Sequence, residues 1–288
     1  MGEVKEGKSG RMRAPLRHRT REVLTRAIGL QLLNVARVVL TVLLSVVCAA
    51  PSSGALPDTV DKIRPGIVAV GTVKSAKRAN ADGPALNYRG TGFVVGDGRQ
   101  VVTNAHVIPQ NLDVAAMEAL AVFVGRGVSG EARQARVLRS DTEHDLVLLE
   151  IGGTVLPALQ LGDSSLVREG SEIAFTGYPI GPVLGLYPAT HRGIVAAVTP
   201  VVIPAISAQT LTAEQIKRMR SPFDVYQLDA VAYPGNSGSP VYEVGTGRVI
   251  GVINSVLVKR TKEAAIQDPS GITYAIPVRY VRALMTGD

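Results

Sequence analysis

The chain has 288 residues, of which 46% are hydrophobic, with 30 Gly, 17 Pro, no Trp and one Cys. This length and apolar content can fill a buried core and exclude a disordered or low-complexity chain, and a single cysteine excludes a disulfide framework or a multi-cysteine metal cluster. The net charge of +7 raises the question of an anionic partner such as nucleic acid or a membrane surface.

Most of this charge lies at the N-terminus. Residues 1–37 carry nine basic and three acidic side chains, a charge of +6, which leaves +1 for the rest of the chain. Directly after them, Val38–Ala50 is a run of thirteen uncharged residues, followed by the small residues Ser53–Ala55. A basic segment, a short apolar run and small residues together predict a secretory signal. Nucleic acid is therefore not expected as a partner.

We expect residues 1–55 to be a basic n-region with a signal peptide or an N-terminal membrane anchor, and residues 56–288 to be the exported domain. The apolar run is shorter than the roughly 20 residues of a membrane span, and extending it to residues 28–50 includes polar side chains. In both cases the basic block stays cytoplasmic and the rest is periplasmic or secreted. Cleavage would also remove Cys48, and an uncleaved segment would be the only contact with the membrane.

After residue 57 the sequence is rich in short β-branched runs separated by Gly, Pro, Asn and Asp, a pattern typical of an all-β barrel or sandwich. The first six predicted strands are Gly66–Val73, Thr91–Val95, Val101–Asn104, Ala119–Gly125, Ala132–Arg139 and Asp145–Ile151. The next six are Glu172–Gly177, Thr190–Val202, Val225–Ala230, Pro240–Val244, Val249–Val258 and Ile272–Val278. Six strands on each side of Gly162–Gly170 indicate two similar β units.

Few segments have a helical pattern. Thr212 precedes AEQIKRMR with Gln215 at the capping-box position, which predicts a capped surface helix. Asp113–Leu120 is expected to form one helical turn, and Pro277–Met285 a short C-terminal helix.

Three polar residues stand beside these strands in segments suited to chemistry. His106 lies in VVTNAHVI, where an apolar strand breaks into a turn; Asp145 opens DLVLLEI; and Ser237 lies in YPGNSGSP. Each has an ordinary structural explanation on its own, as a strand-end histidine, a turn carboxylate or a residue of a hairpin loop. Their value as a prediction comes from their combination and order.

Together these residues match the needs of nucleophilic catalysis. A serine hydroxyl is a poor nucleophile until a neutral imidazole accepts its proton, and a carboxylate can fix the tautomer of that imidazole. Glycines beside Ser237 allow a tight turn. In such a turn, the backbone N–H groups of Gly235 and Ser237 can point at one spot, as an oxyanion hole requires.

The chain resembles the trypsin-like serine proteases, most closely the bacterial HtrA/Deg branch, in which the order is also His, Asp, Ser. The resemblance spans roughly residues 60–285. Its matching segments are TGFVV at 91–95, TNAHV at 103–107, HDLVLLEI at 144–151, GYPIG at 177–181, GIVAAV at 193–198, LDAVAYPGNSGSP at 228–240, VIGVINS at 249–255 and GITYAIPV at 271–278.

This resemblance implies two six-stranded antiparallel β-barrels, at about 60–160 and 170–280, with the active site between them. It implies His106 as general base, Asp145 as its orienting carboxylate and Ser237 as nucleophile, with the Gly235 and Ser237 amides as the oxyanion hole. This chemistry needs neither a metal ion nor a cofactor.

The substrate pocket is expected to be uncharged. Val231 stands six residues before the nucleophile, where cleavage after Lys or Arg requires a carboxylate, and Val252, Ile253 and Asn254 are expected in the pocket walls. Ile253 also replaces the histidine with which glutamyl endopeptidases read Glu. We therefore predict small or medium aliphatic P1 residues, since an uncharged pocket discriminates weakly.

Other polar residues are given structural roles. Asp141 is the rival of Asp145 but is expected to shape the preceding turn. His144 is expected to be solvated, because it neighbours Asp145 and adjacent strand residues point to opposite faces. His191, next to Arg192, is expected to be a surface residue and not a ligand. The segment Thr199–Asp224 resembles an insertion beside the cleft.

The predicted function is that of an exported serine endopeptidase acting on polypeptides, including misfolded envelope proteins, through an acyl-enzyme. The alternative is a chaperone-like binding protein on the same fold, against which the intact His106, Asp145 and Ser237 set argues. Since the chain stops at Asp288, regulation by an attached PDZ domain is not expected. The resemblance also raises a homotrimer as the expected oligomer.

Overall fold

The protein was analysed as a computed structural model that describes residue 31 and residues 56–74, 86–115, 117–127, 130–179, 185–201, 223–254 and 272–287. The chain divides into two compact units, Met1–Ser52 and Ser53–Asp288, and all the elements named below belong to the second. Apart from residue 31, the expected signal or anchor lies outside the described residues, as do the predicted helix after Thr212 and most of Thr199–Asp224. No helix in the described ranges is long and apolar enough to cross a membrane.

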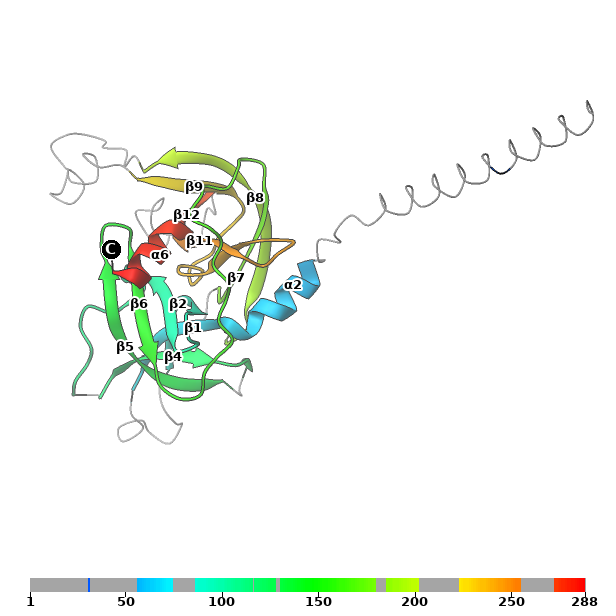
Figure 1. Ribbon diagram of the computed structural model, residues 1–288. Coiled ribbons are helices and arrows are strands. Elements are labelled where there is room, and N and C mark those ends of the chain that lie inside the picture. Colours follow the sequence, from blue (N-terminus) through cyan, green and yellow to red (C-terminus); the bar gives the residue numbers. More distant parts are fainter. Residues whose placement is uncertain are drawn as a thin grey trace, which may run out of the picture. The chain divides into compact units, whose positions relative to one another are not determined.

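Six antiparallel strands close the first barrel, in the order β1-β2-β3-β6-β5-β4 around its wall (Figure 1). They are β1 (Ile67–Val73), β2 (Leu86–Val95), β3 (Gln100–Asn104), β4 (Ala119–Val124), β5 (Glu131–Asp141) and β6 (Leu146–Ile151). β1 is buried on both faces, because Val68 and Val70 belong to one apolar cluster while Ile67 and Ala69 belong to another. This explains why its sequence is a continuous apolar run.

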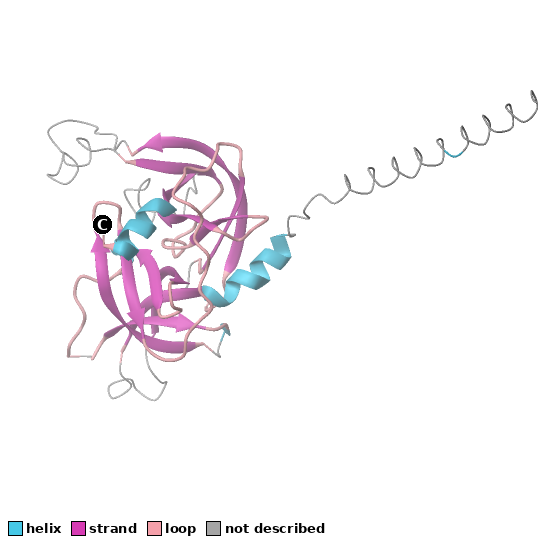
Figure 2. Ribbon diagram, in the orientation of Figure 1, coloured by secondary structure: helices cyan, strands magenta, loops and turns pink. Residues whose placement is uncertain are grey.

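The second barrel repeats this architecture in the order β10-β11-β12-β9-β8-β7. Its strands are β7 (Glu172–Gly177), β8 (Ala189–Pro200), β9 (Asp224–Asp229), β10 (Pro240–Glu243), β11 (Val249–Asn254) and β12 (Ile272–Pro277). Phe175, Tyr226 and Ile253 are fully buried in its core. The predicted all-β fold of two six-stranded barrels is therefore confirmed (Figure 2).

The C-terminal helix is also confirmed, as α6 (Val278–Thr286), and Gly287 ends it in the left-handed conformation with φ 85°. α6 contacts β5 and β6 of the first barrel and β11 and β12 of the second (Figure 1). The Arg139 side chain donates to the carbonyl of Leu284 at 3.1 Å, and Arg282 Nε donates to the carbonyl of Gly162 at 2.8 Å. The helix thus joins the two barrels and the segment between them.

One helix was missed in the sequence, and one predicted helical turn is wrong. The helix α2 (Leu56–Ile63) was not predicted; Thr59, Val60 and Ile63 are buried on it, and Thr59 Oγ1 donates to the carbonyl of Val244 at 2.8 Å. A short 3-10 helix, η1 (Arg64–Gly66), then leads into β1. The helical turn predicted at Asp113–Leu120 is wrong for the described residues, where a turn leads directly into β4.

Candidate active site

His106 lies where β3 ends. Asn104 is the last residue of the strand, and the chain then makes the single 3-10 turn η3 (Ala105–Val107), on which His106 stands. The Ala105 N–H donates to the carbonyl of Asp145 at 3.1 Å, which fixes this turn against the start of β6. The side chain of His106 is 28% exposed, so it is partly accessible from solvent.

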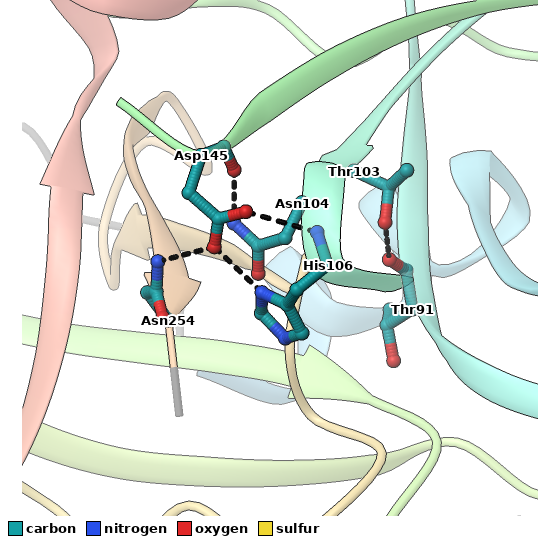
Figure 3. A network of polar contacts seen from close by, with 6 residues as sticks. All are labelled: Thr91, Thr103, Asn104, His106, Asp145 and Asn254. Atoms are coloured by element: carbon teal, nitrogen blue, oxygen red, sulfur yellow. Dashed lines mark hydrogen bonds and ion pairs between the residues drawn. The ribbon is translucent and has the colours of Figure 1, made fainter. Parts of the chain in front are cut away.

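Asp145 lies against His106 and makes contacts through all its oxygen atoms (Figure 3). Its Oδ2 lies 2.6 Å from His106 Nδ1, and its Oδ1 accepts the backbone N–H of His106 at 2.9 Å. Asn254 Nδ2 also donates to Oδ2, at 2.8 Å, and Asn104 Nδ2 donates to the carbonyl of Asp145 at 3.0 Å. A carboxylate on Nδ1 holds the proton there and leaves Nε2 as the proton acceptor.

The backbone of Asp145 is in the left-handed region, with φ 54°, and β6 begins one residue later, at Leu146. The prediction that Asp145 opens the strand is therefore wrong by one residue. Positive φ is uncommon outside glycine, although Asp and Asn adopt it more readily than other residues. The surrounding hydrogen bonds hold Asp145 in this conformation and aim its carboxylate at His106.

Ser237 lies in a tight turn between β9 and β10 and is only 4% exposed. On one side β11 fixes the turn: the Gly238 N–H donates to the carbonyl of Ile253 at 2.9 Å, and the Ile253 N–H donates to the carbonyl of Ser239 at 2.9 Å. On the other side the first barrel fixes it, because the Thr91 N–H donates to the carbonyl of Ser237 at 2.8 Å. The turn is thus held by both barrels.

The turn also lies close to β3, the strand that ends two residues before His106. A Cβ added to Gly238 would lie 2.0 Å from the Thr91 carbonyl oxygen and 2.5 Å from Thr103 Oγ1. Thr103 precedes His106 by three residues on β3. The structure thus brings His106 and Asp145 into direct contact and places the turn of Ser237 against the same strands.

The amides predicted to form the oxyanion hole belong to this turn. Gly235 has φ 98°, a conformation that glycine adopts without strain. Within the described residues its N–H makes no hydrogen bond, while its carbonyl accepts Thr91 Oγ1 at 2.8 Å.

The residues predicted to line the substrate pocket differ in exposure. Val252 and Ile253 are fully buried and belong to two apolar clusters, so their side chains pack inside the protein. Asn254 is 1% exposed and its amide contacts Asp145. Val231 is half-buried, whereas the other three residues are buried.

Asp141 shapes the turn before Asp145, as predicted, since its Oδ1 accepts the N–H groups of Glu143 at 3.1 Å and His144 at 3.0 Å. The expectation that His144 is solvated is wrong. Its Nδ1 lies 2.6 Å from Asp141 Oδ2, and its ring stacks on Tyr280 with centroids 3.9 Å apart. The alternation rule does not apply here, because residues 142–145 form a turn instead of a strand.

His191 is not a freely solvated residue either. It stands on β8, where its ring stacks on Phe175 of β7 with centroids 4.7 Å apart, and Tyr233 lies 5.9 Å away. Its Nε2 is buried and has no partner among the described residues. Burial lowers the pKa of His191 below its usual value of 6.5, because a charged imidazole is poorly solvated there.

Thr91 and Asn104 were not singled out from the sequence, and Asn254 was assigned to the pocket and not to Asp145. The available signals were local: Thr91 stands between two glycines in GTGF, and Asn104 ends an apolar strand where Asn is uncommon. Neither signal indicates which residue is the partner, since the contacts are made between different elements.

Among the described residues, no group of three or more His, Cys, Asp or Glu is placed to hold a metal ion.

Two closed six-stranded barrels, with a His–Asp pair on the first and a glycine-flanked serine on the second, define the chymotrypsin-type class of fold. Residues 90–252 match the trypsin-like peptidase domain, and the chain belongs to this family.

Several known proteins are similar to this chain. A probable periplasmic serine endoprotease, DegP-like, from Halomonas elongata is 31% identical over 193 residues, covering 66% of this chain and 32% of the relative. The serine protease Do-like HtrA of Bacillus subtilis is 27% identical over 238 residues, covering 81% of this chain and 48% of the relative. The chain thus spans about a third to a half of the length of these curated relatives.

Among solved structures, the active form of the Rv3671c protease from M. tuberculosis has a similar fold. The TM-score is 0.56 at 21% identity, with 79% of this chain and 82% of that chain covered.

Proposed function

We propose that this chain is a serine endopeptidase that hydrolyses peptide bonds in polypeptide substrates. The observation that carries the proposal is the double contact of Asp145 with His106, through the backbone N–H at 2.9 Å and through Nδ1 at 2.6 Å. Such a contact fixes both the position and the tautomer of the imidazole, which is what a serine nucleophile needs from its base. Membership of the trypsin-like peptidase family supports the same assignment.

In the proposed mechanism, His106 Nε2 accepts the Ser237 hydroxyl proton while Oγ forms a bond to the scissile carbonyl carbon. The oxyanion that results accepts hydrogen bonds from the N–H groups of Gly235 and Ser237. Asp145 stabilises the imidazolium, which then gives its proton to the leaving amine as the C–N bond breaks. In the second half of the reaction, His106 Nε2 accepts a proton from water while the water oxygen forms a bond to the acyl carbon. The imidazolium then gives that proton to Ser237 Oγ as the ester C–O bond breaks and the acid product leaves.

We propose a preference for small or medium aliphatic P1 side chains. Val231, at the position expected for the pocket base, carries no charge, so a basic P1 side chain would find no partner there. A peptide-library cleavage profile checks this, and dominance of Arg, Lys or Glu at P1 would contradict it.

The substrates and location follow as further parts of the proposal. Export is supported by the basic segment at residues 1–37 and the apolar run that follows it, and by the similarity to the probable periplasmic endoprotease of Halomonas elongata. An exported endopeptidase of this kind would act on unfolded envelope proteins, as a monomer or as a homotrimer. Sedimentation of the purified protein distinguishes these two states.

Hydrolysis of casein by the wild-type protein, beside Ser237→Ala and Ser140→Ala, tests the activity itself. Ser140 is an exposed serine on β5 and provides a matched control. We expect cleavage by wild type and Ser140→Ala and its loss in Ser237→Ala. Equal cleavage by all three would contradict the mechanism, and binding of unfolded casein without cleavage would favour the chaperone-like alternative.

A further inference from the structure

Thr91 connects three segments that are far apart in the sequence. It stands on β2, opposite Ala69 of β1, and is fully buried. Its N–H and its Oγ1 donate to two carbonyls of the turn that carries Ser237, at 2.8 Å each, and the Tyr178 N–H donates to the same Oγ1 at 2.9 Å. Thr103 Oγ1 in turn donates to the carbonyl of Thr91, at 2.7 Å, and so holds Thr91 itself in place (Figure 3).

The two carbonyls that Thr91 holds lie on either side of one peptide group. The carbonyl of Gly235 belongs to the peptide before Asn236, and the carbonyl of Ser237 to the peptide before Gly238. Between them is the Asn236–Ser237 peptide, which carries the Ser237 N–H. The carbonyl of this middle peptide, that of Asn236, accepts the Ser239 N–H at 3.0 Å. Because a peptide group is planar, this bond and the two flanking groups held by Thr91 together set the direction in which the Ser237 N–H points.

Only the hydroxyl contacts of Thr91 depend on its side chain. Any residue at position 91 offers a backbone N–H to Ser237, but only a hydroxyl both donates to the Gly235 carbonyl and accepts the Tyr178 N–H. Without it, the buried Tyr178 N–H and the partly buried Gly235 carbonyl lose these partners, which is unfavourable. The Gly235–Asn236 peptide would keep the bond from the Asn236 N–H to the Tyr233 carbonyl at 3.0 Å, but Gly235, a glycine at φ 98°, could turn more easily, and its own N–H with it.

We infer that Thr91 is a positioning residue for the oxyanion hole: its hydroxyl and its N–H together hold the turn so that the Gly235 and Ser237 amides face a developing oxyanion, and the hydroxyl is the part that a substitution removes. Thr91 does not touch the reacting atoms. This inference rests on the proposed function and adds to it a side chain from the first barrel that controls a turn of the second. The contact with Tyr178 also links the turn to the segment that leaves β7.

The test compares Thr91→Val, which keeps the shape but removes the hydroxyl, with Thr91→Ser, which keeps the hydroxyl. Negative charge develops on the carbonyl oxygen in the transition state, so the hydrogen bonds of the oxyanion hole are stronger there than in the bound substrate. Their loss should therefore lower kcat and leave KM nearly unchanged. We expect Thr91→Val to lower kcat by roughly 10- to 100-fold with KM within about threefold, and Thr91→Ser to restore kcat to within about threefold of wild type. The rate of fluorophosphonate labelling should fall in parallel, because the phosphonyl oxygen occupies the same hole.

Thr72→Val provides the matched control. Thr72 is also a buried threonine of the first barrel with a single hydroxyl contact, to Glu118, and it pairs with Asn87, four residues before Thr91. Its variant should share any loss of stability but not the loss of kcat. A folded Thr91→Val variant with wild-type kcat would overturn the inference, as would an equal loss of kcat in Thr72→Val or in Thr91→Ser.

Should Thr91→Val fail to fold, as judged by circular dichroism, Thr91→Cys takes its place, because a thiol has nearly the shape of the hydroxyl but donates weakly. A kcat between those of wild type and inactive protein is then expected, and wild-type kcat would overturn the inference.

The proposed function and the role of Thr91 are refuted by different results. A wild-type protein that neither cleaves peptides nor reacts with fluorophosphonate refutes the proposed function. An active wild-type protein with an equally active Thr91→Val variant refutes only the role of Thr91.

Discussion

Asp145 uses each of its oxygen atoms to hold its neighbours. Its carbonyl accepts the Asn104 side-chain amide and the Ala105 N–H, its Oδ1 accepts the His106 N–H, and its Oδ2 contacts His106 Nδ1 and Asn254 Nδ2. These bonds stabilise a residue whose backbone is in the left-handed region. Backbone strain and the candidate chemistry therefore coincide at one residue.

Replacing Asn254 tests how much the second donor on Oδ2 contributes. In Asn254→Ala the carboxylate loses that donor and turns more freely away from His106, so we expect kcat/KM to fall by about tenfold, the effect of about 1.4 kcal/mol. Steady-state kinetics with a peptide substrate measure this, with Asn87→Ala, an exposed asparagine on β2, as control. Unchanged kcat/KM in Asn254→Ala would show that the Asp145 carboxylate is oriented without the Asn254 donor.

His144 gives a prediction about stability. Its ring stacks on Tyr280 at 3.9 Å and meets Phe223 edge-on at 4.5 Å, contacts that join the first barrel to the second. We expect His144→Ala to lower the free energy of unfolding by about 1–2 kcal/mol, and His144→Phe to lose less because it keeps both ring contacts. Urea unfolding measures both, and equal losses in the two variants would mean that the Asp141 contact, not stacking, matters.

At the residue scale, the sequence picks out residues whose signal is local, and the catalytic roles that it suggests for them stay a prediction. His106, Asp145 and Ser237 each stand at a recognisable break in a strand pattern, and their order connects them. Thr91 and the role of Asn254 were out of reach, because their partners lie on the other barrel and no periodicity relates the two. His144 was misjudged because a strand was assumed where the backbone makes a turn.

At the scale of elements, the serine turn depends on the absence of a side chain at Gly238. Its φ is 87°, and a Cβ there would meet the Thr91 carbonyl oxygen at 2.0 Å. We expect Gly238→Ala to lower kcat/KM by at least about 100-fold, because the turn must leave β2 and both oxyanion amides shift. Peptide hydrolysis measures the loss, and Gly170→Ala, at a surface glycine with open space around it, controls for positive φ. Equal activity in both variants would contradict this description of the turn.

The strands could be predicted because each carries a β-branched or apolar run that ends at turn residues. The helix α2 could not, since eight residues form little helix alone and its buried face is stabilised by contacts with segments distant in the sequence, among them Val244. The C-terminal helix was recognisable from its own periodicity. What the sequence lacked was therefore the information on how elements dock.

At the scale of the whole molecule, His191 predicts how stability changes with pH. Its pKa is lowered in the folded protein by burial, so between the folded value and about 6.5 the unfolded chain binds more protons. Stability should therefore fall as the pH falls through this window. His191→Phe keeps a ring on Phe175 but cannot titrate, so it should lose less free energy of unfolding between pH 7.5 and 5.5. Equal losses in urea titrations of the two proteins would contradict this.

The two barrels have separate parts in the proposed mechanism: the first holds the base and its carboxylate, and the second supplies the nucleophile. Reaction with a fluorophosphonate, followed by mass spectrometry of the labelled peptide, tests this division most directly. We expect one label, on Ser237, with the labelling rate falling strongly in His106→Ala, because the serine then lacks its general base. A folded wild-type protein that takes no label, or takes it on another residue, would contradict the account.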